Sequence, residues 1–259
     1  MHAAPFLRLA ALTVFLCTGA FAQAPQQTPA YEPSVGQGGK DVVWVPTSRA
    51  LLEKMLDMAR VTPRDFVMDL GSGDGRTVIE AAKRGARALG IEYDANMVEL
   101  SRQNAAREHL AGRATFRKAD LFETDFSAAT VITMFLLPSI NLKLRPALLG
   151  LKPGTRIVSN TFTMDAWQPD ETATLDQDSG CESWCTALLW IVPARVAGNY
   201  SLPQGELALK QEFQKLSGAL RTGEKTFAVQ GRVRGEEVEL RAGGRKYRGH
   251  MQGTALELR

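Results

Sequence analysis

The ten residues from Val67 to Arg76, VMDLGSGDGR, constrain the fold of this chain more than any other stretch. A short apolar run ends in an acid and passes directly into three glycines at alternate positions, after which helix-forming residues begin. Glycines this dense allow a tight turn and a close approach of a ligand to the backbone, and the amides of a following helix then point at that ligand. A plain connection would need one such glycine rather than three. The stretch therefore predicts a strand, a ligand-binding turn and a helix, in that order.

Strand-like and helix-like segments alternate on both sides of this turn. We expect a first helix from about Pro46 to the residue before Pro63. The further expected strands are 66–70, 88–91, 114–118, 130–137 and 155–162, and the further expected helices are 77–84, 96–109 and 142–151. Short apolar strands that alternate with helices predict an α/β fold, a doubly wound and mostly parallel sheet with helices on both faces.

The pattern changes near Pro193, where we place a domain boundary. Residues 193–259 consist of short alternating runs bounded by glycines, which predicts a small antiparallel β meander. This part carries twelve basic and seven acidic residues, whereas residues 23–192 carry eighteen basic and twenty-one acidic ones. The basic side chains of the meander mostly alternate with apolar ones, as on a solvated sheet face, and a surface for anionic partners is the less favoured interpretation. The formal net charge of +3 is too small to indicate nucleic-acid binding.

The first residues have the order of a secretory signal peptide. One arginine precedes the short apolar run LAALTVFLC, and small residues at Ala20 and Ala22 follow it. We expect a cleaved signal peptide over residues 1–22, a flexible leader over 23–40 and an exported, periplasmic protein; an uncleaved membrane anchor is the alternative.

Two cysteines remain beyond that segment, Cys181 and Cys185 in CESWC. In an exported protein, two cysteines four positions apart indicate a disulfide, and two free thiols are the alternative. A metal site is disfavoured because the chain offers only His2, His109 and His250 and no second cysteine cluster.

The spacing of the glycine loop bears on its ligand. The dinucleotide fingerprint is G-x-G-x-x-G/A, whereas Gly71, Gly73 and Gly75 form G-x-G-x-G and Arg76 occupies the third place of the fingerprint. An arginine there would obstruct the close packing of helix and strand that the third glycine provides. The loop therefore argues against a bound dinucleotide and against an NAD-dependent oxidoreductase.

Acidic residues follow three successive strands. Asp69 and Asp74 flank the glycine loop, where they would repel a phosphate and suit a ligand with an ammonium group and a positive sulfur. Glu92 ends the second strand, where an acid can accept both ribose hydroxyls. Asp120 ends the third strand, within reach of an adenine amino group, with Leu121 beside the ring. Together these acids favour a cationic nucleoside ligand.

These motifs carry a family resemblance over roughly residues 41–167. With VMDLGSGDGR, GIEYD, KADLF, the LKPG turn and TRIVSNTF, the chain resembles the class I S-adenosylmethionine-dependent methyltransferases, which have a Rossmann-like fold. With WVPT before the first helix, ATVITMFLLPSINLKLRP at the fourth strand and DAWQPD after the fifth, it is similar to the subgroup of non-SET protein-lysine methyltransferases that includes the mitochondrial enzyme acting on ATP synthase. The meander lies outside the resemblance.

The resemblance implies S-adenosyl-L-methionine as cofactor and roles for individual residues. Asp69, Gly71, Gly73 and Asp74 would contact the methionine part, Glu92 the ribose and Asp120 the adenine, with Thr47 over the cofactor. The full set of expected cofactor-binding residues is Thr47, Asp69, Gly71, Ser72, Gly73, Asp74, Gly75, Glu92, Asp120 and Leu121.

The fourth strand departs from many related enzymes. Methyltransferases that act on amide or ring nitrogens have an Asn/Asp-Pro-Pro-Tyr/Phe motif there, whereas this chain has Phe135-Leu-Leu-Pro138, which argues against those substrates. A lysine must lose its proton before it accepts a methyl group, and burial against aromatic walls favours that loss. We expect Phe135, Pro138 and Trp167 to form the substrate pocket, and we assign no catalytic base and no metal.

The sequence thus predicts a methyltransferase that acts on a protein side chain such as lysine, or less favourably on a small molecule. No nucleic-acid partner is expected. Attachment to a membrane is expected only if the signal segment remains uncleaved. The alternative is a non-catalytic exported protein that binds a nucleoside-like ligand, in which the meander is the working part.

Overall fold

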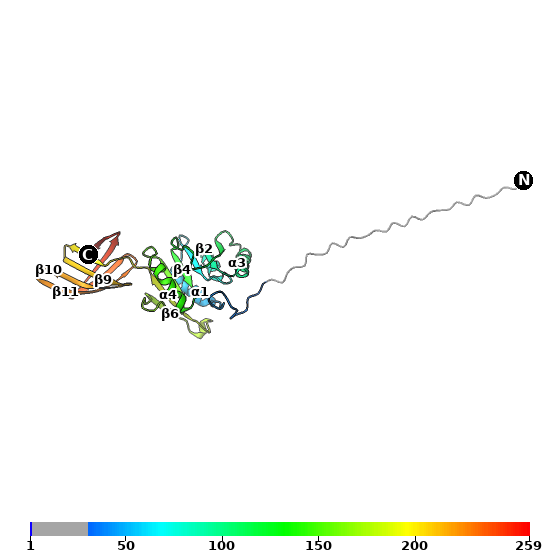
Figure 1. Cartoon of the computed structure of the whole chain (residues 1–259), viewed down its shortest axis with the longest axis horizontal. Coiled ribbons are helices and arrows are strands. Elements are labelled where there is room, and N and C mark those ends of the chain that lie inside the picture. The colour runs from blue at the N-terminus through cyan, green and yellow to red at the C-terminus, as the bar shows by residue number, and fades with distance from the viewer. Residues whose placement is uncertain (2–30) are drawn as a thin grey trace. The chain divides into compact units, whose positions relative to one another are not determined.

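The computed structural model describes Met1 and residues 31–259 (Figure 1). Apart from Met1, the predicted signal peptide lies outside these residues, and so do residues 23–30 of the predicted leader. Residues 32–259 form one compact unit that contains two seven-stranded sheets. Among the described residues, no helix is long and apolar enough to span a membrane.

The first sheet has the strand order β3-β2-β1-β4-β5-β7-β6. Its strands are β1 Phe66–Leu70, β2 Arg87–Glu92, β3 Ala114–Lys118, β4 Val131–Met134, β5 Arg156–Asn160, β6 Glu171–Thr174 and β7 Thr186–Ile191. Strands β1 to β5 are parallel to one another, and β7 runs antiparallel to both β5 and β6. The predicted α/β fold with a mostly parallel sheet is confirmed.

Helices cover both faces of this sheet. They are α1 Arg49–Met58, α2 Arg76–Lys83, α3 Ala95–Arg107 and α4 Pro138–Leu149, with the 3₁₀ turn η1 Gln177–Ser179 before β7. One apolar cluster joins α1, α2 and α3 to one face, and a second joins α4 to the other. Neighbouring strand residues alternate between the clusters, as Val67 and Met68 do, because side chains along a strand point to opposite faces.

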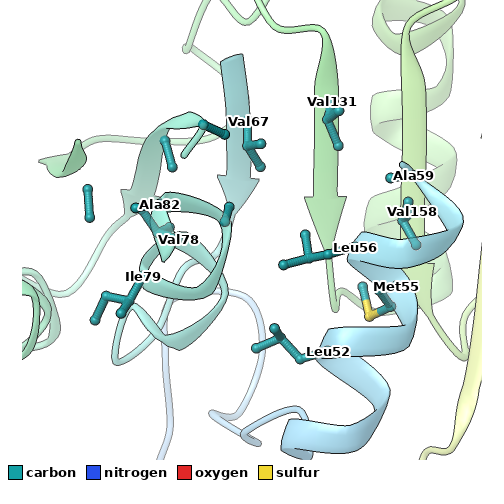
Figure 2. Close-up of a cluster of buried hydrophobic side chains, with 14 of the residues drawn as sticks. Leu52, Met55, Leu56, Ala59, Val67, Val78, Ile79, Ala82, Val131 and Val158 are labelled. Atoms are coloured by element: carbon teal, nitrogen blue, oxygen red, sulfur yellow. The ribbon is translucent and has the colours of Figure 1, made fainter. Parts of the chain in front are cut away.

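Helix α1 shows how the sequence produces this packing. Its N-cap Ser48 accepts a hydrogen bond from the Leu51 amide, which satisfies one of the free amides at the helix start. Figure 2 shows Leu52, Met55 and Leu56 on the side of the helix turned toward the strands that carry Val67 and Val131.

Two predicted boundaries were wrong around the fourth strand. The expected strand 130–137 ends at Met134, and the helix expected at 142–151 begins at Pro138. Proline suits the first turn of a helix because its φ is preset and the amide it lacks would have no partner there. The apolar run FLLPSI therefore turns into a helix instead of continuing the strand.

The second sheet is the predicted antiparallel meander. Its strands are β8 Gly198–Leu202, β9 Gly205–Glu212, β10 Lys215–Thr222, β11 Lys225–Arg234, β12 Glu237–Ala242, β13 Arg245–Gln252 and β14 Ala255–Leu258, and each pairs with the next (Figure 1). Along β12 exposed and buried residues alternate, and the buried ones join one apolar cluster. The boundary predicted near Pro193 falls between β7 and β8.

The segment before β6 makes several contacts with the meander. The Gln214 side-chain amide donates to the Gln168 carbonyl over 2.6 Å, and the Arg232 guanidinium binds the buried carboxylate of Asp170 over 2.5 Å. The connection between β7 and β8 adds another contact, in which the Ala194 amide donates to the Gly235 carbonyl over 2.7 Å.

Candidate functional site

A cavity lies at the carboxyl ends of the first four strands. Its lining comprises Asp69, Gly71–Asp74, Arg76 and Thr77 after β1, Ile91–Asp94 and Met97 after β2, Ala119–Leu121 after β3, Met134–Leu136 and Ile140 after β4, and residues 37–47 with Met55 from the amino-terminal side. Ligands of open parallel sheets bind at this edge, because the loops that leave the strands converge there.

Residues 34–44 fold back on themselves, and residues 37–47 form one wall of the cavity. The Gly36 amide donates to the Trp44 carbonyl, and the Trp44 amide donates to the Gln37 carbonyl, over 2.8 and 2.9 Å. The prediction of a flexible leader as far as residue 40 therefore does not fit these residues, because their backbone groups pair with those of residues 42–44. Glycine-rich composition here reflects tight turns.

Gly73 and Gly75 of the loop have different structural roles. Gly73 has a φ of +53°, and a Cβ on it would lie 2.6 Å from the indole nitrogen of Trp44. Gly75 has a φ of +83° and is the N-cap of α2, but it does not line the cavity. A Cβ there would lie 2.8 Å from both Phe116 and Ser101. Gly75, predicted as a cofactor-binding residue, thus serves the packing of α2 against β3 and α3.

Asp69 is a buried acid at the floor of the cavity. Burial raises its pKa to about 7, opposed by the hydrogen bond from Thr133 and assisted by the negative charges of Glu92 and Asp74. The carboxylate is 5% exposed and accepts from the Thr133 hydroxyl over 2.6 Å. A cationic group placed in the cavity would favour the ionised form of Asp69.

Asp74 is paired within the loop. The Arg76 guanidinium donates to both of its carboxylate oxygens, over 3.0 Å to Oδ1 and 2.6 Å to Oδ2, and also to the Thr47 carbonyl over 3.1 Å. Arg76 was expected to obstruct packing at this point. It lines the cavity instead, and it ties the wall residue Thr47 to the glycine loop.

Glu92 braces the glycine loop. Its Oε2 accepts from the Gly73 amide over 2.9 Å, and its Oε1 accepts from the amides of Tyr93 and Asp94 over 2.7 and 3.0 Å. Each oxygen of a carboxylate can accept more than one hydrogen bond, so capacity remains for a ligand. The position of Glu92 on the cavity wall is compatible with the ribose role expected for it.

Asp120 and Leu121 line the cavity at its third-strand side. The Asp120 carboxylate pairs with the ammonium of Lys40, which lowers the pKa of Asp120 together with the bond from the Phe122 amide. Lys40 also lies over the Tyr93 ring, 4.8 Å from its centroid. The acid expected to meet the adenine amino group therefore has a cationic partner from the wall segment.

The three residues predicted to form the substrate pocket do not lie together in the structure. Phe135 lines the cavity. Pro138 begins α4 and lines neither this cavity nor its neighbour. Trp167 is 0% exposed, because it packs against Trp190 and stacks on Phe213 of the meander. It is a core residue rather than a pocket wall.

Sequence reasoning missed three contributors to this region. Residues 37–40 of the cavity wall lie within the predicted leader. Thr133, which pairs with Asp69, lay inside an apolar run and gave no signal. Trp184 packs with Phe135 and Phe162 beside the cavity, and its place in the CESWC loop was the available clue.

The residues of the cavity fit the expected cofactor. Six acidic residues line it, Asp41, Asp69, Asp74, Glu92, Asp94 and Asp120, and the glycine loop allows close approach to the backbone. Such a donor set suits an ammonium group, a positive sulfur and ribose hydroxyls, and it opposes a phosphate. Within the described residues, no group of three or more His, Cys, Asp or Glu side chains could hold a metal ion.

Comparison with known proteins agrees with this chemistry. The sequence profile described as the ANTKMT methyltransferase domain matches residues 69–171. A protein-lysine N-methyltransferase of Saccharolobus islandicus is 43% identical over 133 residues, which is 50% of this chain and 83% of that protein. The human lysine N-methyltransferase named for the C subunit of ATP synthase is 36% identical over 128 residues, 49% of this chain and 54% of that protein.

A solved structure resembles the same part of the chain. A crystal structure of a protein named as an RNA methyltransferase from Salinibacter ruber, in complex with S-adenosyl-L-homocysteine, is 46% identical, with a TM-score of 0.54. The match covers 59% of this chain and 96% of that one. The chain thus spans most of the length of two relatives, but only about half the length of the human one.

Proposed function

The chain belongs to the family of S-adenosylmethionine-dependent methyltransferases that carry the ANTKMT-type domain, and from that premise we propose that its methyl acceptor is a lysine side chain of a protein. S-Adenosylmethionine is its cofactor. When bound, it supplies a methyl group on a positively charged sulfur. The observation that carries the proposal is an aromatic and apolar groove that shares Phe135 with the carboxylate-lined cavity.

The residues of the chain would bind the cofactor and orient it toward the acceptor. Asp69 and the glycine loop would hold the methionine part, and Glu92 and Asp120 the nucleoside. Residues 37–47 line the cavity from its amino-terminal side. Methyl transfer to an amine needs a neutral nitrogen and a fixed line of approach, and a dry aromatic wall favours the neutral amine by desolvation. No described residue is assigned as a catalytic base.

RNA is the competing acceptor, because the Salinibacter ruber protein is named an RNA methyltransferase. Two observations favour a protein. The two lysine methyltransferases named above match about half of the chain. Residues 23–192 carry eighteen basic and twenty-one acidic residues, whereas a surface that binds nucleic acid is basic.

The test uses the purified chain with S-adenosylmethionine that carries a labelled methyl group. The acceptors are a peptide library with a central lysine, the same library with arginine at that position, and a mixture of short RNAs. Label only on the lysine library supports the proposal. Label on RNA alone overturns it, and binding of S-adenosylhomocysteine without label on any acceptor favours the non-catalytic alternative.

We also propose that the protein is exported and that residues 1–22 are removed. The order of charged, apolar and small residues in this segment supports export, and so does the disulfide between Cys181 and Cys185. Mass spectrometry of the native amino terminus tests this: a terminus at Gln23 supports cleavage, and a terminus at Met1 contradicts it.

A further inference from the structure

A second groove adjoins the cofactor cavity. It has a volume of about 430 Å³ and is lined by residues 38–43 and Val45 and by Phe135, Leu137, Phe162 and Trp184. Phe135 and the segment 38–43 line both spaces. The groove is therefore continuous with the site where the methyl donor is held.

Three aromatic rings from three parts of the chain meet in this groove. Phe135 follows β4, Phe162 follows β5, and Trp184 comes from the loop before β7. The ring centroids of Phe162 and Trp184 are 5.2 Å apart, those of Phe135 and Phe162 5.9 Å, and those of Phe135 and Trp184 6.2 Å. Rings at these separations pack against each other.

The cluster is at the surface rather than in the core. Trp184 is 45% exposed and the neighbouring Leu137 is 42% exposed, whereas the core tryptophans Trp167 and Trp190 are 0% exposed. Trp184 and Leu137 therefore form an exposed apolar patch along one groove, and such a patch marks a site of interaction.

The backbone around Phe162 is firmly held. Its carbonyl accepts from the Ser159 hydroxyl over 2.9 Å and from the side-chain amide of buried Asn141 over 3.1 Å, and its amide donates to the Asn160 carbonyl over 2.6 Å. The preceding Thr161 has a φ of +57°, an uncommon conformation for a residue with a side chain. These bonds fix the direction in which the Phe162 ring leaves the end of β5.

Trp184 is held in a different way. It lies within the loop closed by the Cys181–Cys185 disulfide and has a φ of +57°. Cys181 is buried at 1% exposure in the apolar cluster below the sheet face, so the disulfide anchors the loop to the core.

We infer that Phe135, Phe162 and Trp184 form the acceptor subsite and that Trp184 determines the specificity for a lysine side chain. This inference rests on the proposed function. The apolar wall of Leu137 and Val43 suits the methylene stem, and ring faces hold an alkylammonium group before and after it is methylated. The groove ends at Phe135, where the amine meets the cofactor cavity. Asp41, which also lines the groove, adds an acidic group for a cationic side chain.

The first arm of the test measures binding. Protein with ¹⁵N-labelled indoles and bound S-adenosylhomocysteine is titrated with the amide of Nα-acetyl-trimethyllysine, and the Trp184 signal is assigned with Trp184→Phe. A shift of the Trp184 signal with the Trp190 signal unchanged supports the inference. An unchanged Trp184 signal at millimolar probe overturns it. The uncharged norleucine analogue is the matched probe and should bind more weakly.

The second arm measures kinetics on the lysine peptide. Trp184→Ala should raise KM about five- to tenfold, with kcat within about twofold, and Trp184→Phe should restore most of the loss because it keeps a ring face. Leu142→Ala, an exposed apolar residue that lines neither space, is the control. Unchanged affinity for S-adenosylhomocysteine shows that each variant is folded. An unchanged KM in Trp184→Ala overturns the inference.

The two arms distinguish a wrong proposed function from a wrong assignment of the acceptor subsite. If the wild-type protein binds S-adenosylhomocysteine but labels no lysine peptide, the lysine proposal fails whatever the variants do. If the wild-type protein labels the peptide and the indole of Trp184 does not respond, the proposed function stands and the subsite assignment fails.

Discussion

Thr133 of β4 donates its hydroxyl hydrogen to the buried carboxylate of its register partner on β1, Asp69, with 2.6 Å between Oγ1 and Oδ1. Burial raises the pKa of Asp69 to about 7, and the Thr133 hydrogen bond acts in the opposite direction. The cofactor cavity therefore contains a carboxyl group whose pKa lies near neutral pH, and a cationic ligand bound beside it would favour its ionised form.

Cofactor affinity should rise with pH between about 6 and 8. A cationic ligand favours the ionised carboxylate, so below pH 7 binding must release a proton from Asp69. Calorimetric titration with S-adenosylhomocysteine in two buffers of different ionisation enthalpy measures that proton. Asp69→Asn should bind more weakly and show no pH dependence in this range. Equal affinity of the wild-type protein at pH 6 and pH 8 would contradict the assignment.

The same group affects the stability of the ligand-free protein. The folded-state pKa of about 7 exceeds the unfolded value of 3.8, so the folded state binds more protons between these values. The contribution to stability is present below pH 3.8 and is lost as pH rises through 7. Asp69 should lower the free energy of unfolding by about 1.4 kcal/mol per pH unit in this window. Urea unfolding of wild-type protein and Asp69→Asn at pH 5 and pH 7 isolates this term.

Thr133→Val should raise the pKa of Asp69 and therefore the pH at which cofactor binding reaches its midpoint. The substitution keeps the shape of the side chain and removes a hydrogen bond to the carboxylate. Loss of such a bond raises the pKa by about one unit or more. Thr130→Val is the matched control, because the Thr130 hydroxyl donates to Asp65 over 2.8 Å and Asp65 does not line the cavity. Calorimetry across pH 6–9 should show a higher midpoint for Thr133→Val alone.

Glu92 has two separable roles. In the structure it accepts a hydrogen bond from the glycine loop, and it is expected to contact the ribose as well. Glu92→Ala should weaken S-adenosylhomocysteine binding by about ten- to a hundredfold, because it removes an acceptor of the Gly73 amide and of the ligand. Glu123→Ala, an exposed acid outside the cavity, should leave affinity unchanged.

A ligand that lacks a ribose hydroxyl separates the two roles. If Glu92 contacts the ribose, wild-type protein should discriminate between S-adenosylhomocysteine and its 2′-deoxy analogue, and Glu92→Ala should not. Equal discrimination by both proteins would leave only the bracing role.

The sequence predicted the α/β fold and the edge of the sheet where the cavity lies, because both follow from local patterns. The glycine loop, Glu92 and Asp120 all follow buried strands, and the ends of parallel strands converge. Residues that act through distant contacts were harder to place. Trp167 was expected in the pocket, but β7 and the meander bury it, and neither contact has a local signature. Arg76 looked obstructive because its partner Asp74 was assigned to the ligand.

The third loop glycine offers a stability test. Gly75→Ala places a methyl group 2.8 Å from Phe116 and Ser101 at a φ of +83°, so it should destabilise the protein by about 2–4 kcal/mol through overpacking and backbone strain. Gly154→Ala is the control, because Gly154 has a φ of +88° and nothing within 4 Å of the added Cβ. It should cost only about 1 kcal/mol, since αL strain alone remains. Equal losses in urea unfolding would contradict the packing role of Gly75.

The disulfide should matter for the acceptor more than for the cofactor. Replacement of Cys181 and Cys185 by serine frees the loop that carries Trp184, with a loss of at most about 2 kcal/mol in stability because the closed loop is short. KM for a lysine peptide should rise several-fold, while the affinity for S-adenosylhomocysteine stays the same, since neither cysteine lines the cofactor cavity. Reduction of the wild-type protein should have the same effect, and reduction of Trp184→Ala should have none. A reduced wild-type protein with unchanged KM would show that the folded loop positions Trp184 without the disulfide.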